Sequence, residues 1–550
     1  MKHITSLSIN LAVIVAALAI PVQMAAQHKY TFTEVPTLGG PNIYANQTGA
    51  KNELLNAGGA LTGGADTTIT DPYCSDTPDC FAEHAFIFRN GTVTDLSTLP
   101  GGFNSQAFWI NDNGVAVGFS QIGVNDPLNG NVQELRGTVW RSGKIVEIGT
   151  LGGNDSMAQG VNNRGQVVGF ALNPIPDSIA PLPWPTEMRA FLWDHGVLQN
   201  LGTLGGPDSW AFFINDRGQV VGISYPDSNP SFVCDTPGAN HTFLWENGRM
   251  QDIGTLGGSC SWPEGLSEQG RIVGWSTLAG DSATHPFLWD RGSLTDLGTL
   301  GGSAGFGTSV NNKGEVVGGS DTADGGFLGF IWNDGMITPL QPLPGDCFSI
   351  AIRNNSKSQI LGTSVSCDGT VGRGVLWENG SVTDLNAFVP PESGFDVIGD
   401  VLYLNDRGEI AGNGLLTNGD IRFFTLTPVG GNAAASASAA IQSVPQPSAS
   451  AAHGKPTPET LAKVRGRLLP RYHIPGLPTG NNRQSDFVAV CGVRAHTRRN
   501  HEIQIINPDP DQCCSTCRAG AASTVGAAPA LQTHRPGYVR WLDQRHRPHD

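Results

Sequence analysis

The sequence predicts an all-β fold assembled from one repeated unit of short strands, and three observations support this prediction. Glycine is abundant, with 72 among 550 residues, whereas only 15% of the residues are charged. Val, Ile, Thr, Phe and Trp recur in short runs between Gly-rich turns, which is typical of strands joined by tight connections. The segments LGTLGG, FLW and INDRGQVVG also return along the chain in nearly the same letters.

Each repeat offers four strands in a fixed order. In one copy the first is RAFLW from Arg189 and the second is LQNLGTL from Leu198. The third is WAFFIN from Trp210, and a turn with Asp and Gly leads into the fourth, QVVG from Gln219. Asn, Asp and Gly supply the positive φ angles that hairpin turns need. The third strand ends at eight places, which are Leu55, Ile110, Val161, Ile214, Leu266, Val310, Ile352 and Leu404.

Four short strands per repeat, at a period of roughly 50 residues, are the signature of a β-propeller blade. A β-helix is the main alternative, but its coils are usually shorter. The repeat region begins with a lone second strand, YTFTEVPTLGG from Tyr30, and ends with a first strand, RFFTLTP from Arg422. We therefore expect eight four-stranded blades, the last completed by the N-terminal strand, with seven blades as the alternative. Such a joint removes an open sheet edge.

A charge pattern supports the pairing of the first and second strands. The first strand begins with a basic residue in seven of eight copies, which are His84, Arg136, Arg189, His241, His285, Arg373 and Arg422. Eleven residues later stand Asp95, Glu147, Asn200, Asp252, Asp296 and Asp384, and Glu34 takes the equivalent place for Arg422. We expect a polar pair across each hairpin, within one residue of register. Metal ligation by the histidines is less favoured, because arginine replaces them freely.

The Gly-Gly turn has a structural explanation. If the third strand is the innermost, TLGG carries the chain from the outer edge of one blade to the centre of the next. Crossing three strand spacings requires about 15 Å, which about five extended residues supply. The glycines then allow a sharp turn and a close pass over the neighbouring blade.

The combination of an HAF or RAF plus LW segment, the LGTLGG turn and the IN-x-x-G-x-VVG hairpin resembles the bacterial extracellular HAF repeat family. The letters HAF themselves stand at residues 84–86. The resemblance covers about residues 30–430. It implies an exported repeat protein, and it brings no activity and no catalytic residues with it.

The segments outside the repeats predict export. Residues 1–26 have the pattern of a signal peptide, because Lys2 precedes an apolar run that ends near small residues at Ala25 and Ala26. The apolar run is too short to span a membrane comfortably. We therefore expect a secreted monomer, extracellular or else periplasmic or bound at the cell surface, with no membrane span after signal cleavage.

Charge divides the chain into an acidic body and a basic tail. Residues 27–430 form the predicted propeller, 431–456 an Ala/Ser/Pro linker, and 457–550 a tail with a short basic helix and then mostly disorder. Residues 431–550 hold 14 Lys and Arg against 7 Asp and Glu, whereas the preceding residues hold 19 against 41. An acidic body disfavours nucleic acid as a partner.

Candidate ligand-binding residues lie on one face, which we call the top face. It carries the turns from second to third strands and the long, variable loops from fourth to first strands, where binding residues usually lie. Aromatic residues stand just past several Gly-Gly turns, at Tyr44, Trp210, Trp262 and Phe306. Their rings offer stacking surfaces for sugars, but packing between blades is the favoured alternative. Asp155 and Asp208 are the best-placed carboxylates, with turn capping as the favoured alternative.

Six cysteines fall in top-face loops of the repeats. In an exported protein they suggest disulfides. The candidate pairs are Cys74–Cys80, Cys234–Cys260 and Cys347–Cys367. No motif for a nucleophile, a phosphate loop, zinc or calcium stands out, so we expect no cofactor, no metal and no catalytic residues.

These observations favour a non-catalytic binding or scaffold protein that acts outside the cytoplasm. Its top-face ligand would be an extracellular polysaccharide or a protein. The alternative is a secreted polysaccharide hydrolase or lyase, in which carboxylates from distant repeats converge near the propeller channel.

Overall fold

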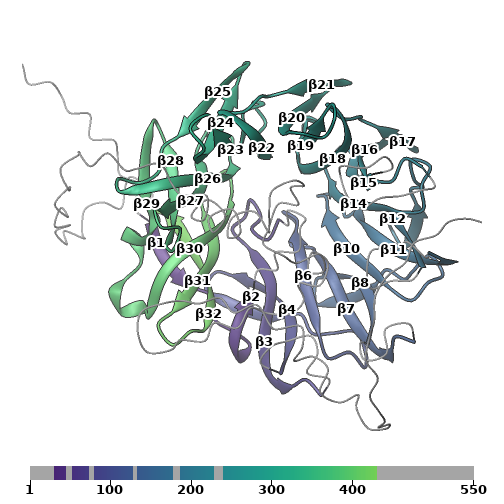
Figure 1. Cartoon of the computed structure of the whole chain (residues 1–550). Coiled ribbons are helices and arrows are strands. Elements are labelled where there is room, and N and C mark those ends of the chain that lie inside the picture. Colours follow the sequence, from purple (N-terminus) through teal and green to yellow (C-terminus); the bar gives the residue numbers. More distant parts are fainter. Residues whose placement is uncertain are drawn as a thin grey trace, which may run out of the picture.

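The computed structural model describes residues 30–44, 53–72, 80–127, 133–177, 186–227 and 239–429. Within these ranges the chain is nearly all strand, and its helical elements are two short 3₁₀ turns, η1 (Leu385–Phe388) and η2 (Pro391–Ser393). The all-β prediction is therefore confirmed. In Figure 1 the strands follow one another in sequence order around a common centre.

The described strands form units of four, which we number 1 to 8. Unit 1 contains β2 (Gly39–Tyr44), β3 (Leu61–Thr70), β4 (Phe81–Arg89) and β5 (Thr92–Asp95). Unit 2 contains β6 (Ser105–Ile110), β7 (Ala116–Asn125), β8 (Gln133–Arg141) and β9 (Lys144–Glu147). Unit 3 contains β10 (Ser156–Val161), β11 (Val167–Pro176), β12 (Thr186–Asp194) and β13 (Val197–Asn200). Unit 4 contains β14 (Ser209–Ile214), β15 (Val220–Ser224), β16 (His241–Glu246) and β17 (Arg249–Asp252).

Units 5 and 6 are joined into one eight-stranded sheet by a parallel pairing between β20 and β22. Unit 5 contains β18 (Gly257–Leu266), β19 (Ile272–Leu278), β20 (Thr284–Asp290) and β21 (Ser293–Asp296). Unit 6 contains β22 (Gly301–Val310), β23 (Val316–Thr322), β24 (Phe327–Asn333) and β25 (Met336–Leu340). Unit 7 contains β26 (Asp346–Asn354), β27 (Ile360–Ser366), β28 (Gly372–Glu378) and β29 (Ser381–Asp384).

Unit 8 joins the two ends of the described chain. It contains β30 (Phe395–Leu404), β31 (Ile410–Leu416) and β32 (Ile421–Pro428), and its fourth strand is β1 (Tyr30–Glu34). β1 runs antiparallel to β32, with Tyr30 opposite Pro428 and Glu34 opposite Phe424. An N-terminal strand thus completes a sheet whose other three strands lie almost four hundred residues away in sequence.

Burial follows the strand order in each unit. From here on the strands of a unit are counted from the innermost outwards, so the second strand of a unit is the fourth of the sequence repeat and the third is its first. The strands that carry the IN segments are innermost, and from β6 to β30 each of them contacts the inner strand of the next unit. The second strands are almost entirely buried along their first halves, as in β3, β7 and β11. The outermost strands, such as β9, are mostly exposed. The core therefore lies between neighbouring units, where the inner two strands of each unit pack against the next.

A β-bulge interrupts the inner strand at the same place in units 2 to 8. In unit 4 the register shifts between Ala211 and Phe213, and Gly222 of β15 pairs with Ala211 just before the shift. A Cβ on Gly222 would lie far closer than 3.0 Å to the carbonyl oxygen of Trp210. The same overlap occurs at the equivalent glycines, which are Gly118, Gly169, Gly274, Gly318, Gly362 and Gly412. The glycine of VVG is thus required by the bulge of the inner strand.

The TLGG turns have the structural role predicted from the sequence. In unit 4 the first glycine, Gly205, has φ +132°, and a Cβ on the second, Gly206, would lie 2.6 Å from the Cβ of Tyr225. The Leu204 amide donates to Ser224 Oγ at 3.0 Å, which fixes the turn on the second strand. The first glycine therefore supplies the turn and the second allows the close approach.

Asparagine side chains connect the turns between inner and second strands from unit to unit. Each Nδ2 donates to the backbone oxygen of the equivalent residue in the next unit. The bonds run Asn56 to Asn111 (2.9 Å), Asn111 to Asn162 (2.8 Å), Asn162 to Asn215 (3.0 Å), Asn215 to Ser267 (3.2 Å), Asn311 to Asn355 (3.0 Å) and Asn355 to Asn405 (3.0 Å). Asn405 then donates to Asn56 at 3.1 Å, from unit 8 back to unit 1. We call these seven residues the asparagine chain.

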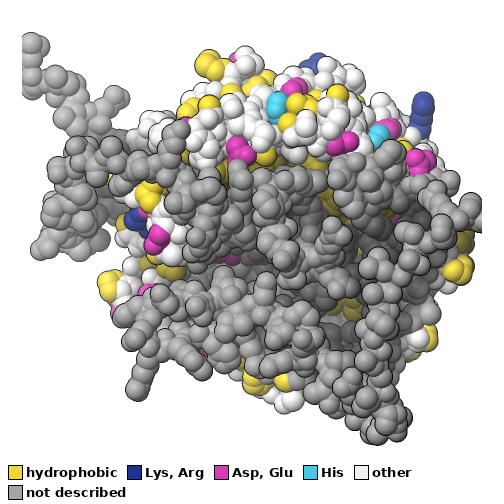
Figure 2. Space-filling view, viewed as in Figure 1, with side chains coloured by type: hydrophobic (Ala, Val, Ile, Leu, Met, Phe, Trp, Pro, Cys, Tyr) yellow, Lys and Arg dark blue, Asp and Glu magenta, His cyan; other side chains and the backbone are white. Residues whose placement is uncertain are grey.

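The predicted base–acid pairs form in six of seven places. His84–Asp95 (3.0 Å), Arg136–Glu147 (3.2 Å), His241–Asp252 (2.8 Å), His285–Asp296 (2.8 Å), Arg373–Asp384 (3.7 Å) and Arg422–Glu34 (3.4 Å) are ion-pair contacts. In Figure 2 histidine side chains on the visible face lie beside acidic ones. Arg189 pairs with Glu187 at 2.6 Å.

The register predicted for these pairs was wrong. Asp95 lies opposite Phe86, two residues beyond His84, and Asp252 lies opposite Phe243 in the same way. The two members are therefore diagonal neighbours on one side of the hairpin, a separation that long side chains can bridge.

Candidate functional site

Two of the four aromatic residues proposed for ligand stacking are buried. Phe306 is 1% exposed and Trp262 is 7% exposed. Trp262 stacks on Trp275 with ring centroids 6.4 Å apart, and Phe306 stacks on Phe327 at 6.1 Å. Their burial corrects the expectation of exposed rings and matches the packing alternative. The side chain of Tyr44 lies outside the described residues.

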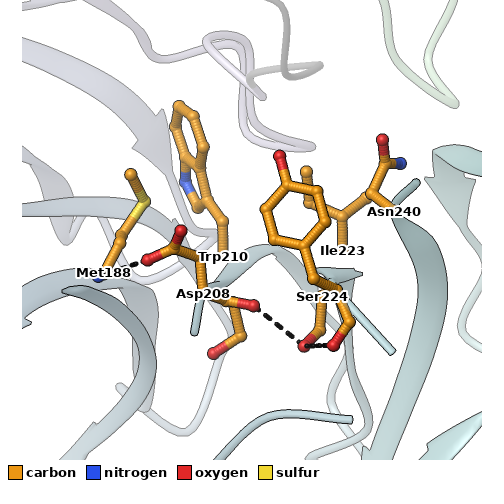
Figure 3. Close-up of a pocket in the computed structure, with 8 residues that line it drawn as sticks. Met188, Asp208, Trp210, Ile223, Ser224 and Asn240 are labelled. Atoms are coloured by element: carbon orange, nitrogen blue, oxygen red, sulfur yellow. Dashed lines mark hydrogen bonds between the residues drawn. The ribbon is translucent and has the colours of Figure 1, made fainter. Parts of the chain in front are cut away.

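Trp210 is half-buried and sits at the edge of a small top-face cavity. Its ring centroid lies 4.9 Å from that of Phe170 in unit 3 and 5.1 Å from that of Phe212. The cavity has a volume of about 20 Å³ and is also lined by Met188, Asp208 and Asn240. Figure 3 shows the Asp208 carboxylate next to the Met188 backbone, with the Trp210 indole beside it. The space is enough for about one water molecule.

Asp155 and Asp208 occupy one repeated position, just before the inner strand. Asp208 Oδ1 accepts a hydrogen bond from the Met188 amide at 2.7 Å, and Asp155 Oδ1 accepts one from the Leu135 amide at 2.7 Å. Asn104 Oδ1 accepts from the Glu83 amide in the same way, at 2.8 Å. Because asparagine replaces aspartate here, the shared role of the position is to cap a strand amide of the preceding unit rather than a turn of its own.

Each of these aspartates faces a second carboxyl group. Burial raises the pKa of Asp208 to about 7, and the nearby carboxyl of Asp177 adds to the rise. Burial also raises the pKa of Asp155 to about 7, with a further contribution from Asp126. These carboxyl pairs can therefore hold a proton near neutral pH, as buried paired acids do.

At one of these positions an asparagine replaces one member of the carboxyl pair, so that a single charge is left. Asn104 Nδ2 donates to Asp71 Oδ2 at 2.9 Å, and Asp71 has the same place in unit 1 as Asp177 has in unit 3. The amide–carboxylate pair satisfies both side chains without a shared proton. The unit 1 copy is thus a natural control for the two acid pairs.

Replacing Asp208 by asparagine is expected to stabilise the protein above neutral pH, by about 1 kcal/mol or more. The raised pKa means that the folded state binds more protons than the unfolded state between about pH 4 and 7, so wild-type stability falls as pH rises through this range. Thermal unfolding of wild type and D208N between pH 5 and 8 measures the difference, which should grow with pH. The reciprocal change N104D should introduce the same loss of folding stability as the pH rises. A variant that is less stable than wild type at pH 8 would contradict this account.

A group of side chains missed by the sequence interpretation fills the region between inner strands. Arg353 Nη1 lies 3.0 Å from Glu53 Oε2, and the Arg353 guanidinium stands over the Tyr403 ring at 5.6 Å. Burial raises the pKa of Glu53, although Arg353 opposes the rise. Trp109 of unit 2 also contacts Phe213 of unit 4, with ring centroids 6.4 Å apart.

These contacts bypass an intervening unit. Trp109 and Phe213 are the residues just after the bulge in units 2 and 4, and unit 3 has Gly160 at that position. Glu53 belongs to unit 1 and Arg353 to unit 7, with Tyr403 of unit 8 between them. Trp109 and Phe213 thus meet across a glycine, whereas Arg353 and Glu53 meet beside the ring of Tyr403.

The disulfide prediction is confirmed for Cys347–Cys367, whose Cα atoms lie 4.7 Å apart. Cys80 and Cys260 are also disulfide-bonded. Their predicted partners, Cys74 and Cys234, lie outside the described residues.

The described residues contain no group of three or more His, Cys, Asp or Glu side chains placed to hold a metal ion. Among the same residues, no helix is long and apolar enough to cross a membrane.

Comparison with protein-family models and with curated proteins gives no match. Among solved structures, the β-propeller domain of the Trilobed protease from Pyrococcus furiosus matches with a TM-score of 0.35 and 6% identity, over 57% of this chain and 89% of that one. A puromycin-hydrolyzing peptidase from Mycobacterium tuberculosis matches with a TM-score of 0.37 and 11% identity, over 70% of this chain and 61% of that one. An acylaminoacyl peptidase from Pyrococcus horikoshii matches with a TM-score of 0.33 and 10% identity, over 56% of this chain. The matched region spans 48% of that peptidase.

Proposed function

We propose that the protein is an exported, non-catalytic binding or scaffold module, built as a closed eight-bladed β-propeller of HAF-type repeats. Units 1 to 8 are the blades in this proposal. Two contacts between the ends of the described chain support closure, the pairing of β1 with β32 and the hydrogen bond from Asn405 to Asn56. The pattern of residues 1–26 supports export.

The observation that carries the binding proposal is that one part of the repeat is constant and structural, whereas another part varies. Most of the polar residues that first suggested chemistry have the same structural role in several units: base–acid pairs brace the outer hairpins, and Asp155, Asp208 and Asn104 cap amides. The hairpins between the second and third strands of the units, in contrast, differ in length and sequence from unit to unit. A constant frame that presents variable top-face hairpins is the usual design of a binding scaffold. The ligand would be an extracellular polysaccharide or a protein.

The alternative is a secreted polysaccharide hydrolase or lyase. It is favoured by the two top-face carboxyls whose pKa values are raised to about 7, since a general acid needs a carboxyl that stays protonated near neutral pH. In this alternative Asp155 or Asp208 would donate the proton to the leaving group.

A thermal-shift screen of the whole protein against soluble polysaccharides tests both proposals. A ligand at a hundred times its Kd should stabilise the folded form by about 2.7 kcal/mol, through mass action. A shift without reducing-end or unsaturated products supports the binding module. Cleavage that is lost in the double variant D155N/D208N supports the enzyme instead. If no polysaccharide shifts the melting temperature, the polysaccharide ligand is excluded and a protein partner is left.

A further inference from the structure

Units 1, 2 and 3 differ from the others in their top-face hairpins. Their second strands, β3, β7 and β11, have ten residues each, whereas those of units 4 to 8 have five or seven. The last three residues of β3, β7 and β11 are exposed in every case. The pairing with the next strand continues into this extension, as with Asn125 opposite Gln133 and Pro176 opposite Thr186. Three consecutive units thus extend their paired strands beyond those of units 5 to 8.

An exposed branched apolar residue stands at the same position in each projection. Ile69 is 49% exposed, Val124 is 49% exposed and Ile175 is 51% exposed. Each lies six residues after the glycine at the equivalent repeat position, which is Gly63, Gly118 and Gly169 respectively. In units 5 to 8 the same count leads to polar or small turn residues, which are Gly280, Asp324, Asp368 and Asn418. We call Ile69, Val124 and Ile175 the apolar ridge.

The apolar ridge is not a feature that every repeat needs in order to fold. Units 5 to 8 form a shorter hairpin without an apolar residue at this count, and neighbouring units contact one another along β3, β6, β7 and β10. A row of exposed apolar side chains on adjacent elements is typical of an interaction surface. The hairpin ends that carry the ridge also have a net negative formal charge: Glu134 and Glu187 pair with Arg136 and Arg189, and the excess comes from Glu83, Asp177 and the buried Asp71 and Asp126. A partner that is both apolar and basic would match this surface.

The chain contains such a segment beyond the described residues. Leu461, Val464 and Leu468 recur at helical spacing, and Lys463, Arg465 and Arg467 alternate with them. The 26 residues of 431–456 connect this segment to the end of β32. A flexible linker of that length has a root-mean-square span of about 28 Å. Fully extended, the same 26 residues can span about 86 Å, well beyond the length of a ten-residue strand of about 33 Å, so the linker is long enough to reach the far end of the second strands.

We propose that the apolar ridge docks residues 459–469 of the same chain, with Leu461, Val464 and Leu468 against Ile69, Val124 and Ile175. The acidic hairpin ends attract the basic side chains of the segment. This docking goes beyond the proposed ligand-binding function and does not depend on it. It gives the exposed ridge and the opposite charge of the tail one explanation.

Trypsin cleavage of the full-length protein tests the docking. A docked segment is protected after Lys463, Arg465 and Arg467, whereas Arg518 in the same tail is an internal reference. The double variant V124S/I175S should raise the cleavage rate at Arg465 and Arg467, relative to Arg518, by about tenfold, a change of about 1.4 kcal/mol in docking. About 1 M salt, where the Debye length is about 3 Å, should raise it further.

The control is the double variant V197S/M336S, which removes apolar side chains that are 67% and 68% exposed on other hairpins. It should leave the relative rate unchanged. Equal rates in wild type and V124S/I175S would overturn the proposal, and so would equal acceleration in both double variants. Light scattering tests the other possible occupant of the apolar ridge, a second copy of the protein. A dimer that dissociates in V124S/I175S, with tail cleavage unchanged, would assign the ridge to a second copy and would also overturn the proposal. Melting temperatures close to wild type verify that each variant is folded.

Discussion

Replacing Gly222 by alanine is expected to destabilise the protein by about 3 kcal/mol or more. The added Cβ would overlap the Trp210 carbonyl oxygen, a backbone atom that cannot move away by a side-chain rotation. That carbonyl is held by the bulge between Ala211 and Phe213, so the strand pair of β14 and β15 would have to separate. Denaturant unfolding of wild type and G222A measures the loss.

A matched control is available in a neighbouring strand. Gly137 of β8 has ordinary backbone angles, and a Cβ there would lie 3.4 Å from its nearest neighbour, the Ala158 amide nitrogen. Units 1 and 3 have Ala85 and Ala190 at the same position. G137A should therefore be tolerated, within about 0.5 kcal/mol of wild type. If G222A were as stable as G137A, the bulge would not be what selects the glycine.

Repetition explains why much of the frame could be predicted from the sequence. A pattern seen eight times averages out local exceptions, so the order of strands, the partner of β1 and the Arg422–Glu34 pair all followed from counting copies. Turn glycines were equally predictable, because positive φ and close approach leave few other residues. Register was less predictable, since a spacing of eleven residues fits several diagonal contacts.

The features that were missed depend on contacts between units rather than on the pattern within one. In unit 7 the sequence aligned Ile352 with the end of the inner strand, but the structure places Asn354 there, opposite Ile360. The Glu53–Arg353 pair joins residues 300 positions apart and occurs once, so no repeat pattern predicts it. The asparagine chain did leave a signal, an Asn at the same turn in seven copies, but a turn residue alone explains that signal equally well.

The asparagine chain gives the second large expected effect. Asn405 is 7% exposed. Its Nδ2 donates to Asn56 oxygen at 3.1 Å and to Glu409 at 2.6 Å, while Oδ1 accepts from the amides of Arg407 and Glu409 at 3.0 Å. Alanine would leave several of these partners buried without a hydrogen bond, so N405A should lose about 2 to 4 kcal/mol. Because this bond joins the inner turns of units 8 and 1, hydrogen exchange should accelerate on both sides of that joint, in β30 and β31 and in β3.

Two further variants separate a link between units from a local turn effect. N418A removes an exposed asparagine from another turn of unit 8 and should change stability by less than about 0.5 kcal/mol. Ser267 stands where the other seven units have asparagine, and no described side chain at this position donates to the Asn311 oxygen. S267N should supply that donor and add about 1 kcal/mol. If N405A accelerated exchange only in its own turn and S267N gave no gain, the asparagines would be turn caps alone. A loss of stability in N405A together with a gain in S267N would instead establish that these side chains bind each unit to the next, including the last unit to the first.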